Sequence, residues 1–238
     1  MAYADLHIHS SFSSDGTSDV ETILRYTATQ TNLSIIAITD HNEIAGALLA
    51  EKLAPGYGLQ VVTGSEVSTS EGHLLALFIR ESVPAGMPLY DTLMYVKKLG
   101  GTCIVPHPGA RFTSSVSLAK IHTLLEDAQA SQVLSGMEIF NAGLLRTNSN
   151  AQAANFALEH EISMVAGSDA HIYRCIGTGA TGFAGSTLDE LRHALEMHQT
   201  HILQHYPVST RNIIGGWLYH RLVRSSRQLL KRSSAQAT

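Results

Sequence analysis

The chain has 238 residues, enough for one large domain or two small ones, and 44% of them are apolar, which argues against general disorder. Its formal net charge of -4 argues against wholesale nucleic-acid binding through a basic surface. Two cysteines are too few for a disulfide scaffold, so we expect a reducing, cytoplasmic location. The first residues lack the long apolar run of a signal peptide, and no stretch reaches the length of a membrane span.

Short apolar, β-rich runs alternate with longer segments of helical periodicity along most of the chain. The runs predict strands at Ala4–Ile8, Ser34–Thr39, Gln60–Gly64, His73–Ile79, Thr102–Pro106, Gly136–Phe140 and Ile162–Ala166. The periodic segments predict helices at Val20–Gln30, Leu89–Leu99, Leu118–Ala130, Ala151–His160 and Thr187–His198. This alternation is typical of a mostly parallel α/β fold. The fourth strand follows the third too closely for a helical crossover, so we expect it to run antiparallel to its neighbour.

The end of the chain differs from the rest in charge. After Glu196 there are six basic residues and no acidic one, whereas residues 1–196 hold ten basic and twenty acidic side chains. We therefore predict one domain over residues 1–206 and a basic amphipathic tail over residues 207–238, partly disordered. The apolar side of this tail suits packing on the domain or on a partner subunit, an anionic membrane surface, or a nucleic acid. The sequence leaves these three open.

Metal-capable side chains lie at the ends of the predicted strands. His7 and His9 are separated by one residue, so they point the same way from a strand. Because the carboxyl ends of parallel strands share one face of an α/β fold, we expect the side chains from the different strand ends to meet there. The set consists of His7, His9, Asp15, His41, Glu66, His73, His107, Asp169 and His171.

The residue types in this set restrict the metal that it would bind. It offers six imidazoles and three carboxylates but no thiolate, a mixture that suits Zn, Mn or Fe rather than a structural cysteine site. Nine side chains exceed the need of one ion, so two or three divalent ions fit. A bridging carboxylate is the usual means of holding two ions about 3.5–4 Å apart.

The order of the motifs DLHIHS, SDG, TDH, GSE, HL, HPG and GSDAH resembles the PHP (polymerase and histidinol phosphatase) family over roughly residues 4 to 185. The resemblance implies a distorted (β/α)7 barrel with a trinuclear metal site, and hydrolysis of phosphoesters. It also implies three sets of ligands, one for each ion: His7, His9, Glu66 and Asp169; Glu66, His73 and His107; Asp15, His41 and His171.

The mechanism that the resemblance implies is attack on phosphorus by a hydroxide formed from a metal-bridging water. Arg111, four residues beyond His107, is a candidate phosphate clamp, because a guanidinium matches phosphate in two-pronged geometry. Arg146 is a second candidate for this role. Asp40 is expected to orient a metal ligand without binding metal itself. Asn141 either faces the pocket or only ends its strand.

The substrate is restricted less tightly than the reaction. We expect a small phosphorylated molecule, with a nucleotide or a short oligonucleotide among the candidates, and the oligomeric state stays open. The first motifs are similar to a PHP subgroup that dephosphorylates nucleoside 3',5'-bisphosphates and trims short RNA from the 5' end. Members of that subgroup carry a sizeable insertion before the HP motif, whereas here only 33 residues separate His73 from His107. The element that covers the substrate is therefore absent or short.

Three alternatives remain beside a phosphoesterase of this kind. One is a histidinol-phosphate-type phosphatase, for which no residue here selects the imidazole substrate. Another is a non-catalytic metal-binding PHP module, against which the intact set of ligand candidates argues. The third is metal-dependent hydrolysis of an amide or a lactone, against which Arg111 and Arg146 favour phosphate.

Overall fold

The structure is a computed structural model that describes residues 1–111, 113–144 and 148–204. The predicted tail over residues 207–238 and the candidate Arg146 lie outside the described residues. Within the described part of the chain, no helix combines the length and the apolar character that crossing a membrane would require.

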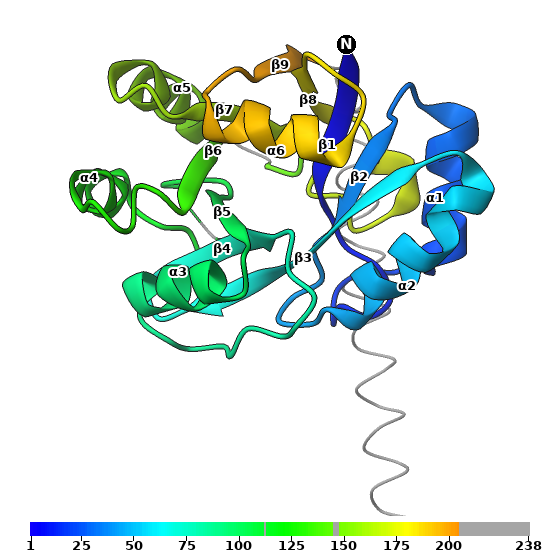
Figure 1. The fold of residues 1–238 in the computed structure, drawn as a ribbon, viewed down its shortest axis with the longest axis horizontal. Coiled ribbons are helices and arrows are strands. Elements are labelled where there is room, and N and C mark those ends of the chain that lie inside the picture. Colours follow the sequence, from blue (N-terminus) through cyan, green and yellow to red (C-terminus); the bar gives the residue numbers. More distant parts are fainter. Residues whose placement is uncertain (112, 145–147, 205–238) are drawn as a thin grey trace, which may run out of the picture.

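One mixed sheet of nine strands curls into a nearly closed barrel (Figure 1). Its strands are β1 (Ala2–Ile8), β2 (Ile35–Ile38), β3 (Gln60–Thr69), β4 (Gly72–Leu77), β5 (Thr102–Val105), β6 (Leu134–Asn141), β7 (Ser163–Gly167), β8 (Gly179–Phe183) and β9 (His201–Gln204). They follow the order β7-β6-β5-β4-β3-β2-β1-β8-β9 across the sheet. β4 runs antiparallel to β3 and to β5, as predicted, so its beginning lies at the same end of the barrel as the ends of its neighbours.

The barrel closes between β7 and β8, and a side chain of β8 bonds to the backbone of β7 there. Thr181 Oγ1 accepts a hydrogen bond from Ala166 N and donates one to Ala166 O, each at 3.0 Å. Gly179 permits this approach, because a Cβ atom there would lie 2.3 Å from the carbonyl oxygen of Gly167. The closure brings the carboxyl end of β7 next to that of β1, and an isolated bridge joins Ile8 to Ala170 there.

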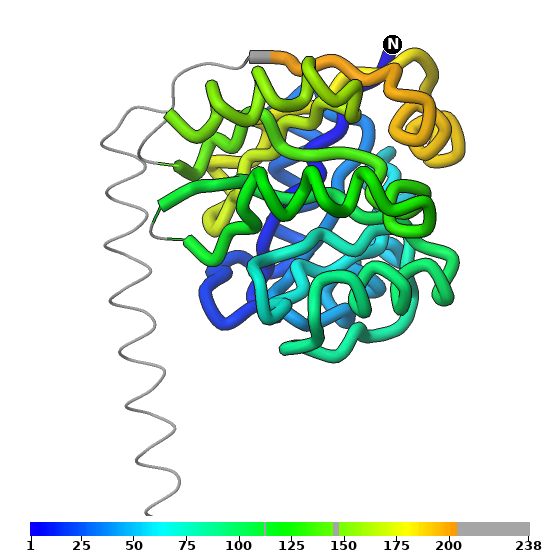
Figure 2. Tube along the Cα trace, turned by 90° about the vertical axis from the view of Figure 1, so that its left-hand side faces the viewer, coloured from blue at the N-terminus to red at the C-terminus, as the bar shows by residue number. Residues whose placement is uncertain are grey.

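Helices surround the barrel on its flanks and cover one of its ends. They are α1 (Val20–Gln30), α2 (Ala45–Leu53), α3 (Leu89–Lys98), α4 (Leu118–Glu126), α5 (Asn148–Glu159) and α6 (Leu188–Glu196), with short 3-10 helices η1 (Ala54–Tyr57) and η2 (Tyr173–Cys175). α3, α4 and α5 lie one above another along one flank, and α1 and α2 lie on the opposite flank (Figures 1 and 2).

Helix α6 lies across the end of the barrel that faces the viewer in Figure 1. Its Leu191 and Leu195 are fully buried in one cluster with Leu6, Leu77 and Phe183 from the strands. A second, larger cluster fills the space between the sheet and the flanking helices. The barrel interior is therefore a packed core that α6 closes at one end.

The elements that differ from the sequence prediction have local causes. α2, β8 and β9 were not predicted, and the sequence of β8 contains two glycines, which are depleted in strands. α4 ends at Glu126 and not at Ala130, because Asp127 is extended and its Oδ1 accepts hydrogen bonds from the amides of Gln129 and Ala130. α6 begins at Leu188, because Thr187 caps it as predicted and forms a capping box with Glu190, and it ends at Glu196, two residues before the predicted end.

Truncating the barrel core should destabilise the fold strongly. Leu77 is fully buried in the cluster beneath α6, so Leu77→Ala removes apolar contacts and leaves a cavity. We expect the free energy of unfolding of the metal-free protein to fall by about 2–5 kcal/mol in urea titrations. Leu158 on α5 is 66% exposed, so the control Leu158→Ala should stay within about 0.5 kcal/mol of wild type. Equal effects of the two substitutions would contradict this assignment of the core.

Candidate metal centre

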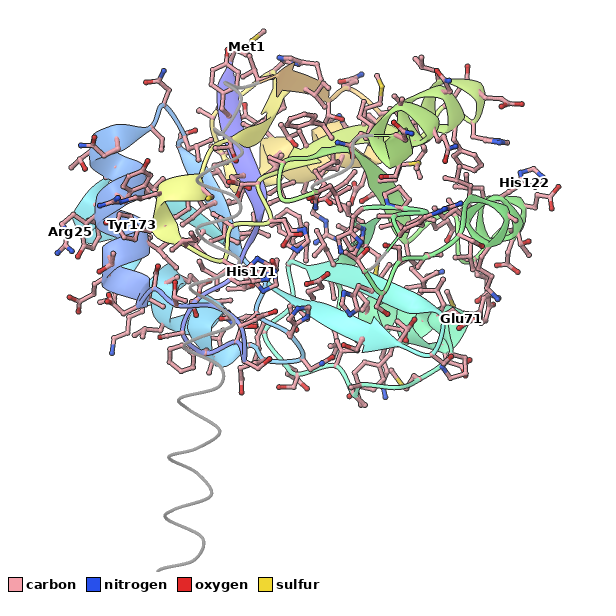
Figure 3. The ribbon with its side chains drawn as sticks, turned by 180° about the vertical axis from the view of Figure 1, so that it is seen from behind. Met1, Arg25, Glu71, His122, His171 and Tyr173 are labelled. Carbon is pink, nitrogen blue, oxygen red and sulfur yellow. The ribbon has the colours of Figure 1, made fainter. Side chains whose placement is uncertain are left out.

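The nine predicted ligand candidates lie together at the end of the barrel opposite α6. Figure 3, which views the molecule from behind Figure 1, shows this end with His171 near its centre. His7 and His9 come from the end of β1 and the residue after it, Glu66 from the middle of β3, and His73 from the beginning of β4. The remaining candidates lie in the loops that follow β1, β2, β5 and β7. The structure thus brings the whole predicted set together, while their role as ligands stays a prediction.

Glu66 is the buried centre of this arrangement. Its Oε2 lies 3.3 Å from the Nε2 atoms of both His7 and His9. Its Oε1 lies 2.9 Å from His73 Nδ1 and 3.1 Å from His107 Nε2. Burial raises the pKa of Glu66, but the surrounding imidazoles outweigh burial and hold that pKa well below its usual value. The two carboxylate oxygens therefore face different sets of imidazoles, as expected of a bridging ligand.

Asp169 completes the inner part of the site on the side of β7. Its Oδ1 lies 3.4 Å from His7 Nε2 and 3.3 Å from His9 Nε2. Asp169 has a φ of 52° and His107 a φ of 34°, so both side chains are presented from left-handed backbone, which is uncommon for residues other than glycine. Such conformations persist only where the surroundings enforce them, and they cluster at functional sites.

A more open group lies beside the inner one. Asp15 Oδ2 is 3.2 Å from His41 Nε2 and 3.2 Å from His171 Nε2. The ring of His9 stacks on that of His171 with the centroids 4.2 Å apart. His41 Nδ1 lies 3.2 Å from Glu66 Oε2, so His41 faces both the open and the inner carboxylate. The potential metal-binding groups therefore overlap, and they are His9, Asp15, His41 and His171; His7, His9 and Glu66; and His41, Glu66 and His73.

The two stacked histidines have opposite pKa shifts. Burial lowers the pKa of His9, and the neighbouring His171 lowers it further, to about 4. Burial also lowers the pKa of His171, but Asp169 and Asp15 outweigh it and raise that pKa to about 9. In the metal-free protein at neutral pH, the ring of His171 is therefore protonated and cationic, while that of His9 is neutral and has one nitrogen lone pair that can bind a cation.

Three buried ring nitrogens indicate whether this set of side chains fits metal ions. His7 Nε2, His9 Nδ1 and His9 Nε2 are buried and have no hydrogen-bond partner among the described residues. Leaving buried polar atoms unpaired is unfavourable, and imidazole nitrogens next to carboxylate oxygens are typical zinc and manganese donors. The residues present therefore fit divalent cations.

Hydrogen bonds at Nδ1 orient two further histidines, and for His171 the bond also fixes the tautomer of the neutral ring. His107 Nδ1 lies 2.9 Å from Ser115 Oγ, and His171 Nδ1 lies 2.9 Å from the carbonyl oxygen of Asp169. Because that carbonyl only accepts, His171 carries its hydrogen on Nδ1 when it is neutral. In each case Nε2 is the nitrogen that faces the carboxylates. Hydrogen bonds of this kind orient metal-binding imidazoles in proteins.

Glu138 in β6 contacts the candidate site but was not among the predicted site residues. It is fully buried, and its Oε1 lies 2.9 Å from His7 Nδ1. Its Oε2 accepts hydrogen bonds from His107 N at 2.9 Å and from Asn141 Nδ2 at 2.8 Å. Glu138 therefore orients one ligand candidate through its ring and another through its backbone. A carboxylate inside an apolar strand could have signalled this role, since burying it without partners is costly.

Two buried aspartates brace the loops that carry ligand candidates. Asp5 accepts hydrogen bonds from the amides of Ser168 and Gly177, which ties β1 to the loop after β7, and burial raises its pKa to about 6. Asp40 accepts hydrogen bonds from Ser10 N and Ser10 Oγ, both at 2.6 Å, and burial raises its pKa to about 6 as well. Asp40 thus holds Ser10, the residue after the ligand candidate His9, and its role in orienting a ligand stays a prediction.

The other predicted polar residues differ in placement. Asn141 is buried and faces the site, since its Nδ2 donates to Asp169 Oδ2 at 3.3 Å as well as to Glu138. Arg111 is exposed on the loop that follows β5, which also carries His107. Its role as a phosphate clamp stays a prediction, and Arg146 lies outside the described residues.

The chain is similar to known proteins both in sequence and in structure. The model of a PHP-associated family, PHP_C, matches residues 147–200. An uncharacterized protein of Methanocaldococcus jannaschii is 35% identical over 149 residues, which cover 58% of this chain and 81% of that protein. The phosphoribosyl 1,2-cyclic phosphate 1,2-diphosphodiesterase of Eggerthella lenta is 38% identical over 87 residues, which cover 34% of this chain and 32% of that enzyme.

The fold is similar to that of a two-domain protein from Bacteroides vulgatus, described as containing a predicted PHP-like metal-dependent phosphoesterase. The TM-score is 0.69 at 22% identity, and the match covers 86% of this chain and 65% of that protein. At this identity the likeness concerns the fold, which is the barrel described above.

Removing the charge of Glu138 should weaken metal binding. Glu138→Gln keeps the shape of the side chain but lowers the basicity and the fixed orientation of His7. We expect affinity for Mn²⁺ or Zn²⁺ to fall about 10–100-fold in competition with a chromophoric chelator. Glu126 on α4 has a side chain that is 68% exposed, so Glu126→Gln serves as the matched control and should bind metal like wild type. Wild-type affinity in Glu138→Gln would show that this carboxylate does not support the site.

Proposed function

Because this chain belongs to the PHP (polymerase and histidinol phosphatase) family, we propose that it hydrolyses a phosphomonoester or phosphodiester at a centre of three divalent metal ions. One observation carries the proposal. Six imidazoles and three carboxylates converge from β1, β3, β4 and the loops after β1, β2, β5 and β7, and three of their buried ring nitrogens have no hydrogen-bond partner among the described residues. Such a donor set suits Mn, Zn or Fe, which are the ions we infer.

The ligand candidates around Glu66 would hold the ions on its two sides. Glu66 would bridge ions, with His7, His9 and Asp169 on one side and His73 and His107 on the other. Ions bound in this way act as Lewis acids, which activate water and neutralise the charge that develops on phosphoryl oxygens.

The surrounding side chains fix the geometry on which this chemistry depends. Glu138 and Ser115 would hold the imidazoles of His7 and His107 in the orientation for binding. Arg111 would bind a phosphate oxygen pair and position the ester, because its guanidinium is exposed on the loop next to the site. A residue that protonates the leaving group is not assigned.

A panel of phosphoesters tests the proposed reaction directly. Protein loaded with Mn²⁺ or Zn²⁺ should release phosphate or alcohol from at least one class among monoesters, linear diesters, cyclic diesters and short oligonucleotides. The cyclic diesters are included because the Eggerthella lenta relative acts on a phosphoribosyl cyclic phosphate. The class hydrolysed separates phosphatase, phosphodiesterase and exonuclease. If the metal-loaded protein hydrolyses none of them, the proposal fails.

Asp169→Asn should abolish metal binding and activity together. Asparagine tolerates the positive φ at this position and keeps the size of the side chain, so the fold should survive while the charge is lost. We expect fewer ions per chain by elemental analysis and a loss of at least about 100-fold in kcat/KM, with an unchanged circular dichroism spectrum. Asp189 is exposed on α6, so Asp189→Asn is the control. Wild-type turnover in Asp169→Asn would contradict the assignment of Asp169 as a metal ligand.

Arg111→Ala should weaken substrate binding more than turnover. If the guanidinium binds the phosphate group in both the ground state and the transition state, its loss raises KM with little change in kcat. We expect a rise in KM of about tenfold, which corresponds to the loss of a charge-assisted hydrogen bond pair. Lys52 on α2 is exposed and provides the control Lys52→Ala. An unchanged KM in Arg111→Ala would show that Arg111 does not bind the phosphate group of the substrate.

A further inference from the structure

The tip of the β3–β4 hairpin carries a carboxylate whose partners lie outside the hairpin. Glu71 lies in the turn between Thr69 and Gly72, two residues before His73. Its Oε2 accepts a hydrogen bond from Leu89 N at 2.5 Å, and its Oε1 lies 2.7 Å from Lys120 Nζ. Figure 3 shows Glu71 at the outer end of the hairpin, well away from His171.

The first of these contacts attaches the hairpin to α3. Leu89 is the first residue of α3, and the preceding Pro88 makes no side-chain capping bond. Glu71 supplies the missing acceptor, and its negative charge is favourable at the positive end of the helix dipole. The hydrogen bond from Ser70 N to the carbonyl oxygen of Met87, at 2.9 Å, reinforces the same attachment.

The second contact attaches the hairpin to the segment that carries His107. Lys120 lies in the first turn of α4, which directly follows the loop of residues 106–117. Nearer the metal centre the same loop contacts the hairpin, because His73 N donates to the carbonyl oxygen of Ser114 at 2.8 Å. A Cβ atom on Gly72 would lie 2.5 Å from Val116 N, so the two backbones are in close contact.

These contacts form a continuous connection from the outer end of the hairpin to the metal centre. We propose that Glu71 is a positioning residue that holds the hairpin against the 106–117 loop, so that His73 and His107 both face Glu66. The side chain acts through the backbone, since its own partners are Leu89 and Lys120. Because the ligand roles of His73 and His107 are part of the proposed function, this inference rests on that proposal.

Metal titration of the whole chain tests the inference. Glu71→Gln removes the negative partner of the ion pair with Lys120, and Lys120→Met removes the positive partner. Lys120→Arg keeps the positive charge and therefore the ion pair. We expect Glu71→Gln and Lys120→Met to bind one of the Co²⁺ or Mn²⁺ ions about tenfold more weakly, with the other ions unaffected and with recovery in Lys120→Arg. The exposed pair of Glu51 and Arg80 provides the control Glu51→Gln. Wild-type affinity for every ion in Glu71→Gln would overturn the proposal.

Amide hydrogen exchange of the metal-free protein gives a second measurement that is independent of metal binding. In Glu71→Gln the His73 amide, which is bonded to Ser114, should exchange about tenfold faster, while the Ile36 amide in β2 keeps its wild-type rate. Equal acceleration of both amides would show a general loss of stability and overturn the positioning role. An unchanged His73 amide would do the same. If wild-type protein bound no metal, the proposed function would fail, and this exchange measurement would still decide whether Glu71 positions the hairpin.

Discussion

The structure depends on the burial of one carboxylate among imidazoles. Glu66 is almost completely buried, and a buried carboxylate is tolerated only where it is paired and hydrogen-bonded. Its partners come from β1, β4 and the loops after β2 and β5, which lie far apart in the sequence. The barrel therefore has to close in one register, because a shift of a single residue in any of these strands would turn a ring away from Glu66.

The same constraint explains why polar residues outside the set of ligand candidates are also buried. Asp5, Asp40 and Glu138 contact amides, a hydroxyl group and a ring nitrogen of the residues around the centre, and none of them is exposed. They fix the loops after β1 and β7 and the ring of His7 with hydrogen bonds and not with apolar contacts. Rigid support of this kind keeps several donors close together even though their charges are poorly solvated.

Much of this arrangement could be predicted from the sequence, and the rest depended on contacts between distant segments. The placement of His7 and His9 on one face, and the reversed direction of β4, follow from strand periodicity and from the short connection before it. The partners of Glu138 could not be predicted, because His7 is 131 residues away in the sequence and β6 and β1 approach each other only through the closure of the barrel. Similarly, Asp40 acts on Ser10 because β1 and β2 are neighbours in the sheet.

The reversed β4 has a consequence for access to the centre. After His73 the chain runs away from the centre in β4 and returns along residues 79–87, whose end bonds to Ser68 and Ser70. It then runs away again in α3 and comes back in β5 to His107. The residues between His73 and His107 thus form successive passes along the height of the barrel. The helix of this segment, α3, therefore lies along the flank of the barrel and not across the end that carries the ligand candidates (Figure 1).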